Sequence, residues 1–364
     1  MQQAVGEQAL TRGAGEWLGL AQARRAEGDV EGQRAALDEA LKLEPRNVRA
    51  LLLKARDHEE AGERVKASAF YQAALKAAPP PHQLPADLVQ ELGRAQQMTR
   101  RYAGEFEAAV RERVASAVGS AAPGSRAEQS LDILFGRKRV YLQEPRSFYF
   151  PGLPQIQFYH RAEFPWMDRV EAATEEIRGE LLEVLREEGA FTPYIQERAD
   201  APPGDLRGML NNPDWSAFFL VKEGALVPAN AARCPKTLAA VEAAPLARLA
   251  GRSPSVLFSL LKPGARIPPH NGMINTRLIC HLPLIVPEGC GFRVGNDVRQ
   301  WREGKAWAFD DTIEHEAWNN GDQMRFILIF DIWRPEMTQA ERELVGAVME
   351  AIDAVTGAPP EWDI

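Results

Sequence analysis

The spacing of hydrophobic residues changes along the chain, from a helical to an alternating pattern. Between Phe164 and Glu188 apolar side chains recur at helical spacing, which predicts one helix. After it, short apolar runs typical of β-strands are separated by Gly, Pro, Asn and Asp turns. These runs are Trp215–Val221, Ser255–Leu261, Arg277–Val286, Phe292–Val294, Lys305–Phe309 and Arg325–Trp333. Short strands without intervening helices predict a β-sandwich or jelly roll, closed by a C-terminal helix over Thr338–Val355.

Residues 14–80 contain an internal repeat. Positions 34 residues apart match in seven pairs: Trp17 and Leu51, Ala21 and Ala55, Gly28 and Gly62, Leu37 and Tyr71, Ala40 and Ala74, Leu41 and Leu75, Pro45 and Pro79. This period, with small residues where two helices cross and a proline after the second helix, resembles the tetratricopeptide repeat. Because one helical hairpin cannot cover its own apolar face, neighbouring hairpins should stack, with a third, decayed unit over residues 85–115. The repeats fit a concave surface that holds a peptide or protein, and equally a packing or dimerisation module.

These patterns divide the chain into three parts. We expect a helical repeat domain over residues 1–115, a linker over 116–130 and a β-rich domain over 131–364. The linker begins with the small and flexible residues of 116–126, and a short helix over 127–135 follows.

Composition and charge narrow the class of protein. The chain has 364 residues, of which 45% are hydrophobic, and this is enough to build a folded core. The formal net charge of -8 argues against nucleic acid as the main partner. The three cysteines have no spacing typical of disulfides or zinc, and no signal peptide or membrane-spanning run is apparent. We therefore expect a cytoplasmic protein.

Two histidines are the candidate metal ligands. His270 follows two prolines at a strand end, and alternation places His315 on the same inward face as Ile313 and Ala317. Histidines on separate strands suit Fe(II), for which a carboxylate usually completes the ligand set. That carboxylate normally lies two residues after the first histidine, where this chain has Gly272. Alone, His270 also fits a hydrogen-bonded structural histidine.

Arg325 is the candidate anion-binding residue. It opens a core strand otherwise free of charge until residue 331, and a buried arginine needs an anionic partner. A ligand carboxylate would match its guanidinium, and Ser259 could add a hydroxyl. The alternative for Arg325 is an internal salt bridge to Asp310 or Asp311. For these two aspartates themselves, hydrogen bonds within a turn are the favoured interpretation, and a hydrogen bond to a ligating histidine is the second one.

Taken together, these residues resemble the aspartyl/asparaginyl β-hydroxylase family. The resemblance extends from Arg139 to about Glu341. It rests on His270, Gly272, Arg277, His281, Phe309-Asp310-Asp311, His315 and Arg325, and on the segments Phe150-Pro151-Gly152-Leu153-Pro154, Asn275-Thr276-Arg277-Leu278 and Asp331-Ile332-Trp333-Arg334-Pro335. Members with tetratricopeptide repeats ahead of this domain are also known.

The resemblance implies a double-stranded β-helix core, a cupin-like jelly roll, that binds Fe(II) through only two histidines. These would be His270 and His315, with Gly272 where other oxygenases have a carboxylate. It also implies that Arg325 and Ser259 hold the distal carboxylate of the cosubstrate 2-oxoglutarate, with His281 nearby. We therefore expect Fe(II) as cofactor and 2-oxoglutarate and O2 as cosubstrates.

The implied activity is hydroxylation of the β-carbon of Asp or Asn in a peptide or protein, which the helical repeats could hold. Arg277 would lie by the carboxylates of substrate or cosubstrate. The animal enzymes have a second arginine where this chain has Ile279, and a tryptophan where it has Val221. The alternatives are hydroxylation of a non-peptide such as an acyl chain, as in lipid A-modifying relatives, halogenation, and a binding adaptor with an inactive oxygenase domain.

Overall fold

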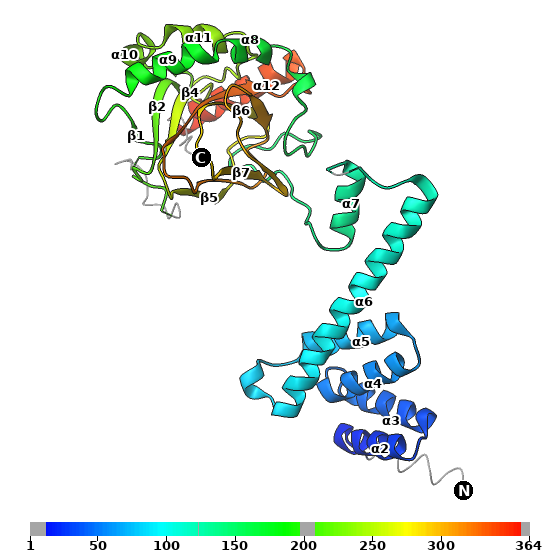
Figure 1. The fold of residues 1–364 in the computed structure, drawn as a ribbon. Coiled ribbons are helices and arrows are strands. Elements are labelled where there is room, and N and C mark those ends of the chain that lie inside the picture. Colours follow the sequence, from blue (N-terminus) through cyan, green and yellow to red (C-terminus); the bar gives the residue numbers. More distant parts are fainter. Residues whose placement is uncertain (1–11, 123, 197–207, 358–364) are drawn as a thin grey trace. The chain divides into compact units, whose positions relative to one another are not determined.

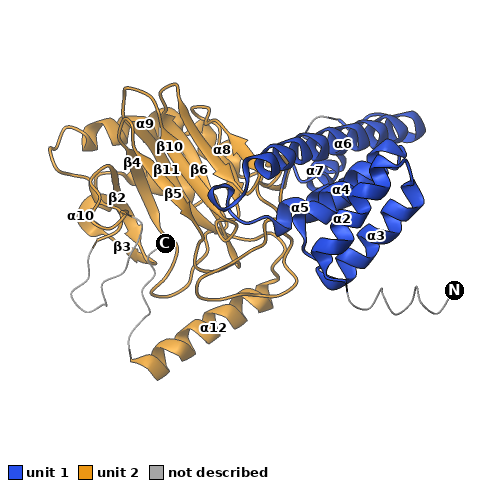
Figure 2. Cartoon of the chain, turned by 90° about the horizontal axis from the view of Figure 1, so that it is seen from below, with its two compact units in different colours: residues 1–138 blue, residues 139–364 orange. Residues whose placement is uncertain are grey.

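The computed structural model describes residues 12–122, 124–196 and 208–357 (Figure 1). The chain divides into two compact units, residues 1–138 and 139–364 (Figure 2). The helix α7, Arg126–Leu134, belongs to the first unit. The boundary between the units therefore lies further along the chain than the linker that we expected over 116–130.

The first unit is built from helix pairs. Helix α2 (Ala14–Ala26) packs against α3 (Val30–Leu43), and α4 (Val48–Glu60) packs against α5 (Arg64–Ala77). Each pair turns at a glycine with a left-handed backbone, Gly28 at φ 77° and Gly62 at φ 74°, where other residues would be strained. The two turns are one repeat period apart, so the sequence repeat corresponds to repeated helix pairs. Their identity as tetratricopeptide repeats stays a prediction.

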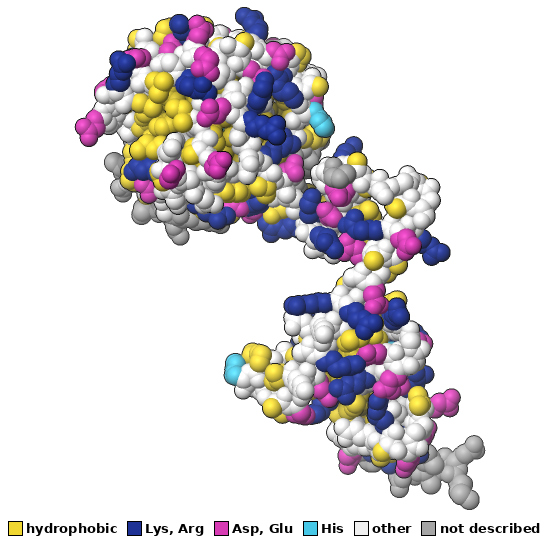
Figure 3. Space-filling model, in the orientation of Figure 1, with side chains coloured by type: hydrophobic (Ala, Val, Ile, Leu, Met, Phe, Trp, Pro, Cys, Tyr) yellow, Lys and Arg dark blue, Asp and Glu magenta, His cyan; other side chains and the backbone are white. Residues whose placement is uncertain are grey.

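A third helix pair is not formed, and this part of the prediction was wrong. After a short 3-10 turn, η1 (Pro81–Gln83), the single helix α6 runs over Ala86–Val118. The range 86–118 contains no proline to end the helix where a third hairpin would turn. On the face drawn in Figure 3, acidic and basic side chains are interspersed over this unit.

The second unit contains two antiparallel sheets. The larger sheet has the order β1 (Thr192–Pro193), β2 (Trp215–Lys222), β4 (Val256–Leu261), β11 (Arg325–Trp333), β6 (Arg277–Ile285) and β9 (Trp307–Phe309), with β3 (Ala225–Leu226) beside β2. The smaller sheet has the order β5 (Arg266–His270), β10 (His315–Asn319), β7 (Cys290–Val294) and β8 (Asp297–Arg299). From β4 onward the chain crosses repeatedly between the sheets, which is the topology of a jelly roll. The predicted antiparallel two-sheet architecture is confirmed.

Helices cover the outer face of the larger sheet (Figure 1). They are α8 (Met167–Ala172), α9 (Thr174–Val184), α10 (Pro228–Ala231) and α11 (Pro235–Val241). The 3-10 turn η2 (Arg161–Glu163) precedes α8, and the helix α12 (Gln339–Thr356) follows the last strand. The one helix predicted between Phe164 and Glu188 is therefore two, interrupted at Ala173.

The two faces of the central strands have different surroundings. In β11, Leu328, Phe330 and Ile332 pack with the helices in the main core. The alternate residues Ile327 and Ile329 point into the space between the two sheets. Burial on both faces explains why this strand is a continuous apolar run, and it puts every second side chain at the functional site.

Phe330→Ala should destabilise the second unit by about 3–5 kcal/mol, because a fully buried ring between β4 and β6 leaves a cavity. The matched control is Val298→Ala on β8, which is 57% exposed and should change stability by less than about 0.5 kcal/mol. Chemical denaturation of the full chain, followed by tryptophan fluorescence, measures both. Equal stabilities of the two variants would contradict this assignment of the core.

Candidate functional site

All of the side chains that we selected from the sequence line one cavity between the two sheets. These are Ser259, His270, Arg277, His281, His315 and Arg325. They come from the larger sheet through β4, β6 and β11, and from the smaller sheet through β5 and β10. Residues that are up to 66 positions apart in the chain, such as Ser259 and Arg325, therefore meet at one site.

The two histidines face each other across neighbouring strands. His270 and His315 are direct partners in the register of β5 and β10, and their ring centroids are 4.1 Å apart. Each Nδ1 lies by a backbone carbonyl oxygen, 2.8 Å from Pro268 for His270 and 3.1 Å from Ile313 for His315. Because a carbonyl oxygen can only accept, each Nδ1 carries a hydrogen, and in the neutral ring this leaves the lone pair on Nε2, as metal ligation requires. Burial lowers the pKa of His315 well below its usual value, which keeps the ring neutral.

Gly272 has no room for a side chain. A Cβ atom there would lie 2.0 Å from Oδ2 of Asp311. Within the described ranges, no group of three or more His, Cys, Asp or Glu side chains could hold a metal ion. The residues present therefore fit a metal held by two histidines, with the remaining positions open to other ligands.

Short contacts join the segments that carry the two histidines. Gly272 donates its backbone N–H to the carbonyl oxygen of Asp311 at 2.7 Å, and the Asn271 side chain donates to that of Thr312 at 2.9 Å. These contacts tie the chain just after His270 to the chain just before His315. The spacing of the ligand pair therefore depends on residues 310–312.

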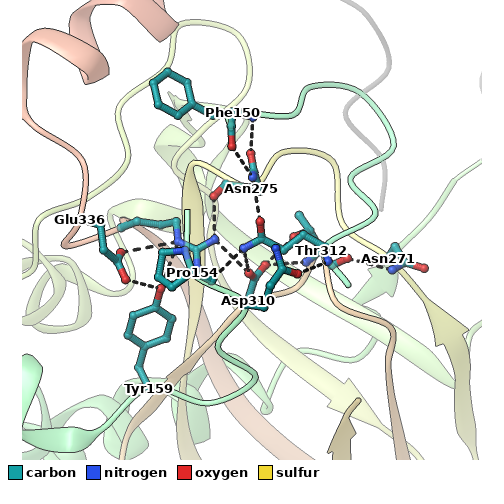
Figure 4. A network of polar contacts seen from close by, with 11 residues as sticks. Phe150, Pro154, Tyr159, Asn271, Asn275, Asp310, Thr312 and Glu336 are labelled. Atoms are coloured by element: carbon teal, nitrogen blue, oxygen red, sulfur yellow. Dashed lines mark hydrogen bonds and ion pairs between the residues drawn. The ribbon is translucent and has the colours of Figure 1, made fainter. Parts of the chain in front are cut away.

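A network of buried polar contacts in turn holds residues 310–312 in place (Figure 4). Asp310 accepts from Arg334 at 2.9 Å, from the Gln143 side chain at 2.6 Å and from the Thr312 hydroxyl at 2.6 Å. Arg334 and Asp310 are both fully buried. The turn chemistry that we favoured for Asp310 is present, and its ion pair with Arg334 was not foreseen. Asp310 is therefore not the partner of Arg325.

Arg325 is a buried cation that needs an external anion. Its side chain is 1% exposed, and the part of the chain that the structure describes gives it no carboxylate partner. Its Nη2 lies 3.5 Å from the Ser259 hydroxyl, and its guanidinium carbon lies 5.1 Å from the ring centroid of Trp301. Burial lowers the pKa of Arg325 to about 10. The internal salt bridge considered from the sequence is absent from the described residues, so a ligand carboxylate is the natural partner.

His281 lies at the same end of the cavity. Its Nδ1 accepts from the indole N–H of Trp301 at 3.4 Å, which leaves the hydrogen of the neutral ring on Nε2. Burial and the charge of Arg325 lower its pKa well below the usual value, so the ring is neutral. His281 can therefore donate one hydrogen bond to a bound anion.

Arg277 already holds two carboxylates. It lies 3.2 Å from Asp311 and 2.8 Å from Asp331, and all three side chains are buried. Burial raises the pKa of Asp311 to about 7, although Arg277 acts to lower it. The expected role of Arg277 beside a substrate stays a prediction, but its charge is compensated within the protein.

Sequence reasoning did not assign to the site five residues that line the cavity: Tyr194, Trp215, Trp301, Asp311 and Asp331. The alternation that places Arg325 and Ile327 inward also places Asp331 inward, so that residue could have been found. Val221 instead packs on the helix side of the sheet. Trp215, from the same strand, lies with its ring centroid 6.3 Å from that of His270, so a tryptophan does line the site.

Gly272→Ala should destabilise the protein by about 1–3 kcal/mol, because its methyl group would displace the Asp311 carboxylate. In an Asp311→Ala background the same change should cost much less. Gly93→Ala in α6, where a Cβ meets nothing within 4 Å, is the control and should be neutral or slightly stabilising. Thermal unfolding of the four proteins of this cycle and of the control measures the coupling. Additive costs would contradict the contact.

Known proteins are similar to this unit over much of its length. The family model described as aspartyl/asparaginyl beta-hydroxylase matches residues 171–335. An ornithine lipid ester-linked acyl 2-hydroxylase of Rhizobium tropici is 38% identical over 187 residues, which are 50% of this chain and 62% of the relative. The aspartyl/asparaginyl beta-hydroxylase of Mus musculus is 39% identical over 137 residues, which are 37% of this chain and 18% of the relative.

A third relative, aspartate beta-hydroxylase domain-containing protein 2 of Homo sapiens, is 30% identical over 211 residues, 56% of this chain and 54% of its own length. The chain thus spans less than two thirds of each of these relatives. The matched range contains every site residue that we selected, from Ser259 to Arg325. The second unit therefore matches the aspartyl/asparaginyl beta-hydroxylase family over residues 171–335, a range that includes the whole lining of the candidate site.

Proposed function

We propose that the second unit is an Fe(II)- and 2-oxoglutarate-dependent dioxygenase that hydroxylates a carbon next to a carbonyl group. The observation that carries this proposal is the combination, in one cavity, of the facing pair His270 and His315 with the uncompensated buried cation Arg325. An iron site and a carboxylate site within one jelly roll are what this reaction needs.

His270 and His315 would hold the iron through Nε2. Bound iron would supply the oxidation, in which O2 gives one oxygen atom to the substrate C–H bond and one to succinate while 2-oxoglutarate loses CO2. The chain's own part is to fix the two rings, through the backbone carbonyls that hold each Nδ1. Because Gly272 has no side chain, it would give the iron no third protein ligand, and the Asp311 carboxylate fills the space where a side chain of residue 272 would lie.

Arg325 would bind the distal carboxylate of 2-oxoglutarate with its planar guanidinium, and the Ser259 hydroxyl lies beside it. His281 would add a hydrogen bond from Nε2. Trp301 covers Arg325 and is itself 6% exposed, so it keeps water away from the ion pair and strengthens it.

The proposed substrate is the β-carbon of an Asp or Asn residue in a peptide or protein, and the helical unit would hold the polypeptide. The second candidate is the carbon next to the carbonyl of an acyl chain. The Rhizobium tropici relative, named as an acyl 2-hydroxylase, and the apolar Ile279 in the cavity favour it. Among the described helices, none has the length and hydropathy needed to cross a membrane. In both candidates the reacting carbon is bonded to a carbonyl carbon.

The metal assignment predicts a spectroscopic change. Anaerobic Fe(II) and 2-oxoglutarate should give the weak visible charge-transfer band of a chelated keto acid, and His270→Ala or His315→Ala should abolish it. His160→Ala, at an exposed histidine on the same unit, is the control and should keep the band. A wild-type protein with neither the band nor uncoupled succinate formation would favour the adaptor with an inactive oxygenase domain.

The cosubstrate assignment predicts that Arg325→Met raises the KM for 2-oxoglutarate about tenfold to a hundredfold, because hydrogen bonds to a charged group are lost. Arg325→Lys should recover part of this loss, since it keeps the charge without the planar fork. Arg302→Met, at an exposed arginine, is the control. Succinate formation against 2-oxoglutarate concentration gives all four values, and an unchanged KM in Arg325→Met would refute the assignment.

A further inference from the structure

The cavity has two polar ends that differ in charge. Arg325 and Asp331 lie on the same inward face of β11, six residues apart, so their Cα atoms are separated by about 20 Å along the strand. One end carries Arg325 with its uncompensated charge. The other end carries Arg277, Asp311 and Asp331, which we call the acidic end. With the cosubstrate at Arg325, the acidic end is left for the substrate.

One guanidinium serves two carboxylates at the acidic end. Arg277 contacts Asp311 at 3.2 Å and Asp331 at 2.8 Å, and Asp331 also accepts the backbone N–H of Ser255 at 2.9 Å. Among the described residues that line the cavity, Arg277 and Arg325 are the only arginine or lysine side chains. The acidic end therefore has no cation whose charge is still uncompensated.

A third carboxylate would be costly there. It would have to give up its hydration and share Arg277 with two buried carboxylates that are already in contact with it. Ile279, which faces Asp331 across the strand pair, offers only apolar contact. A neutral carbonyl group carries no charge to be desolvated, so it can occupy the same space at much lower cost.

One acceptor at this end also lacks a donor. Oδ1 of Asp311 is buried and has no hydrogen-bond partner among the described residues, although Oδ2 contacts Arg277. An ionised carboxylate has no hydrogen to offer it, whereas the NH2 group of a carboxamide has two. An ester is neutral but offers no donor, so it should rank between the two.

Building on the proposed hydroxylase function, we propose that the carbonyl group next to the hydroxylated carbon is uncharged, a carboxamide or an ester, and not an ionised carboxylate. An asparaginyl side chain or an esterified or amidated acyl chain meets this condition. An aspartyl side chain or a free fatty acid does not. Arg277 thus acts as an internal counter-ion that holds Asp311 and Asp331, rather than as a clamp for a substrate carboxylate.

The test compares three probes with the same chain: octanamide, methyl octanoate and octanoate. Binding to the full-length, metal-free protein is measured by ligand-detected NMR at about pH 8, where octanoate is ionised, with saturating 2-oxoglutarate present so that Arg325 is not free to bind the octanoate carboxylate. Octanamide should bind about tenfold or more tightly than octanoate, with methyl octanoate between them. The affinity for methyl octanoate, compared with the affinities for the other two probes, separates the contribution of the hydrogen bond from that of the charge. Octanoate binding as tightly as octanamide, or no preference among the probes, would overturn the proposal.

Two variants test whether the preference for an uncharged probe arises at the acidic end. Ile279→Arg adds a cation beside Asp331 and should strengthen octanoate binding about tenfold, while Ile279→Leu, the matched control, should keep the preference of the wild type. Asp331→Asn removes one of the two carboxylates and should also favour octanoate, so it tests the proposal if Ile279→Arg does not fold. An unchanged preference in the folded variants would overturn the assignment to this end.

The probe measurements do not depend on turnover. A wild-type protein that binds 2-oxoglutarate but forms no succinate would defeat the proposed function, while the order of the three probes could still be measured. Conversely, an active hydroxylase that binds octanoate as well as octanamide would defeat only this inference.

Discussion

The site depends on the pairing of β5 with β10, which sets His270 directly opposite His315. Two protein ligands fix a metal less firmly than three, so the distance between them must be set by the fold. The backbone contact from Gly272 to Asp311 helps to set it, and the buried ion pair of Asp310 with Arg334 holds the loop that makes this contact. Breaking a buried pair costs several kcal/mol, which keeps this loop in one conformation.

The two buried arginines of the cavity differ in whether a carboxylate compensates their charge. Arg325 is buried without a carboxylate among the described residues, whereas Arg277 is buried with two. A buried arginine therefore attracts an external anion at one end of the cavity and does not at the other, because the effect of a buried charge depends on whether the protein already compensates it. The same asymmetry is the physical basis for the two sites that we propose, one for a dianionic cosubstrate and one for an uncharged group.

Continuous apolar runs were sufficient to predict β4, β6 and β11, since long strands that are buried on both faces carry a strong signal. The strands that bear the histidines were harder to delimit. Strand β5 contains Pro268 and Pro269, which are usually read as breaks, and β10 has only five residues. The sequence repeat was sufficient to predict the two helix pairs. It could not predict the single helix α6, because a continuous helix and a decayed helical hairpin have similar amino-acid compositions.

The sequence by itself determined the two-part organisation, the antiparallel sheet domain, and six of the side chains that line the site, because periodicity and residue chemistry are local properties. It also pointed to Gly272, whose lack of a side chain is visible in the sequence. Only the tertiary structure decided which charges are compensated. The ion-pair partners of Asp310 and Arg277 are 24 to 54 residues away in the chain, and contacts over such separations depend on how the sheets pair.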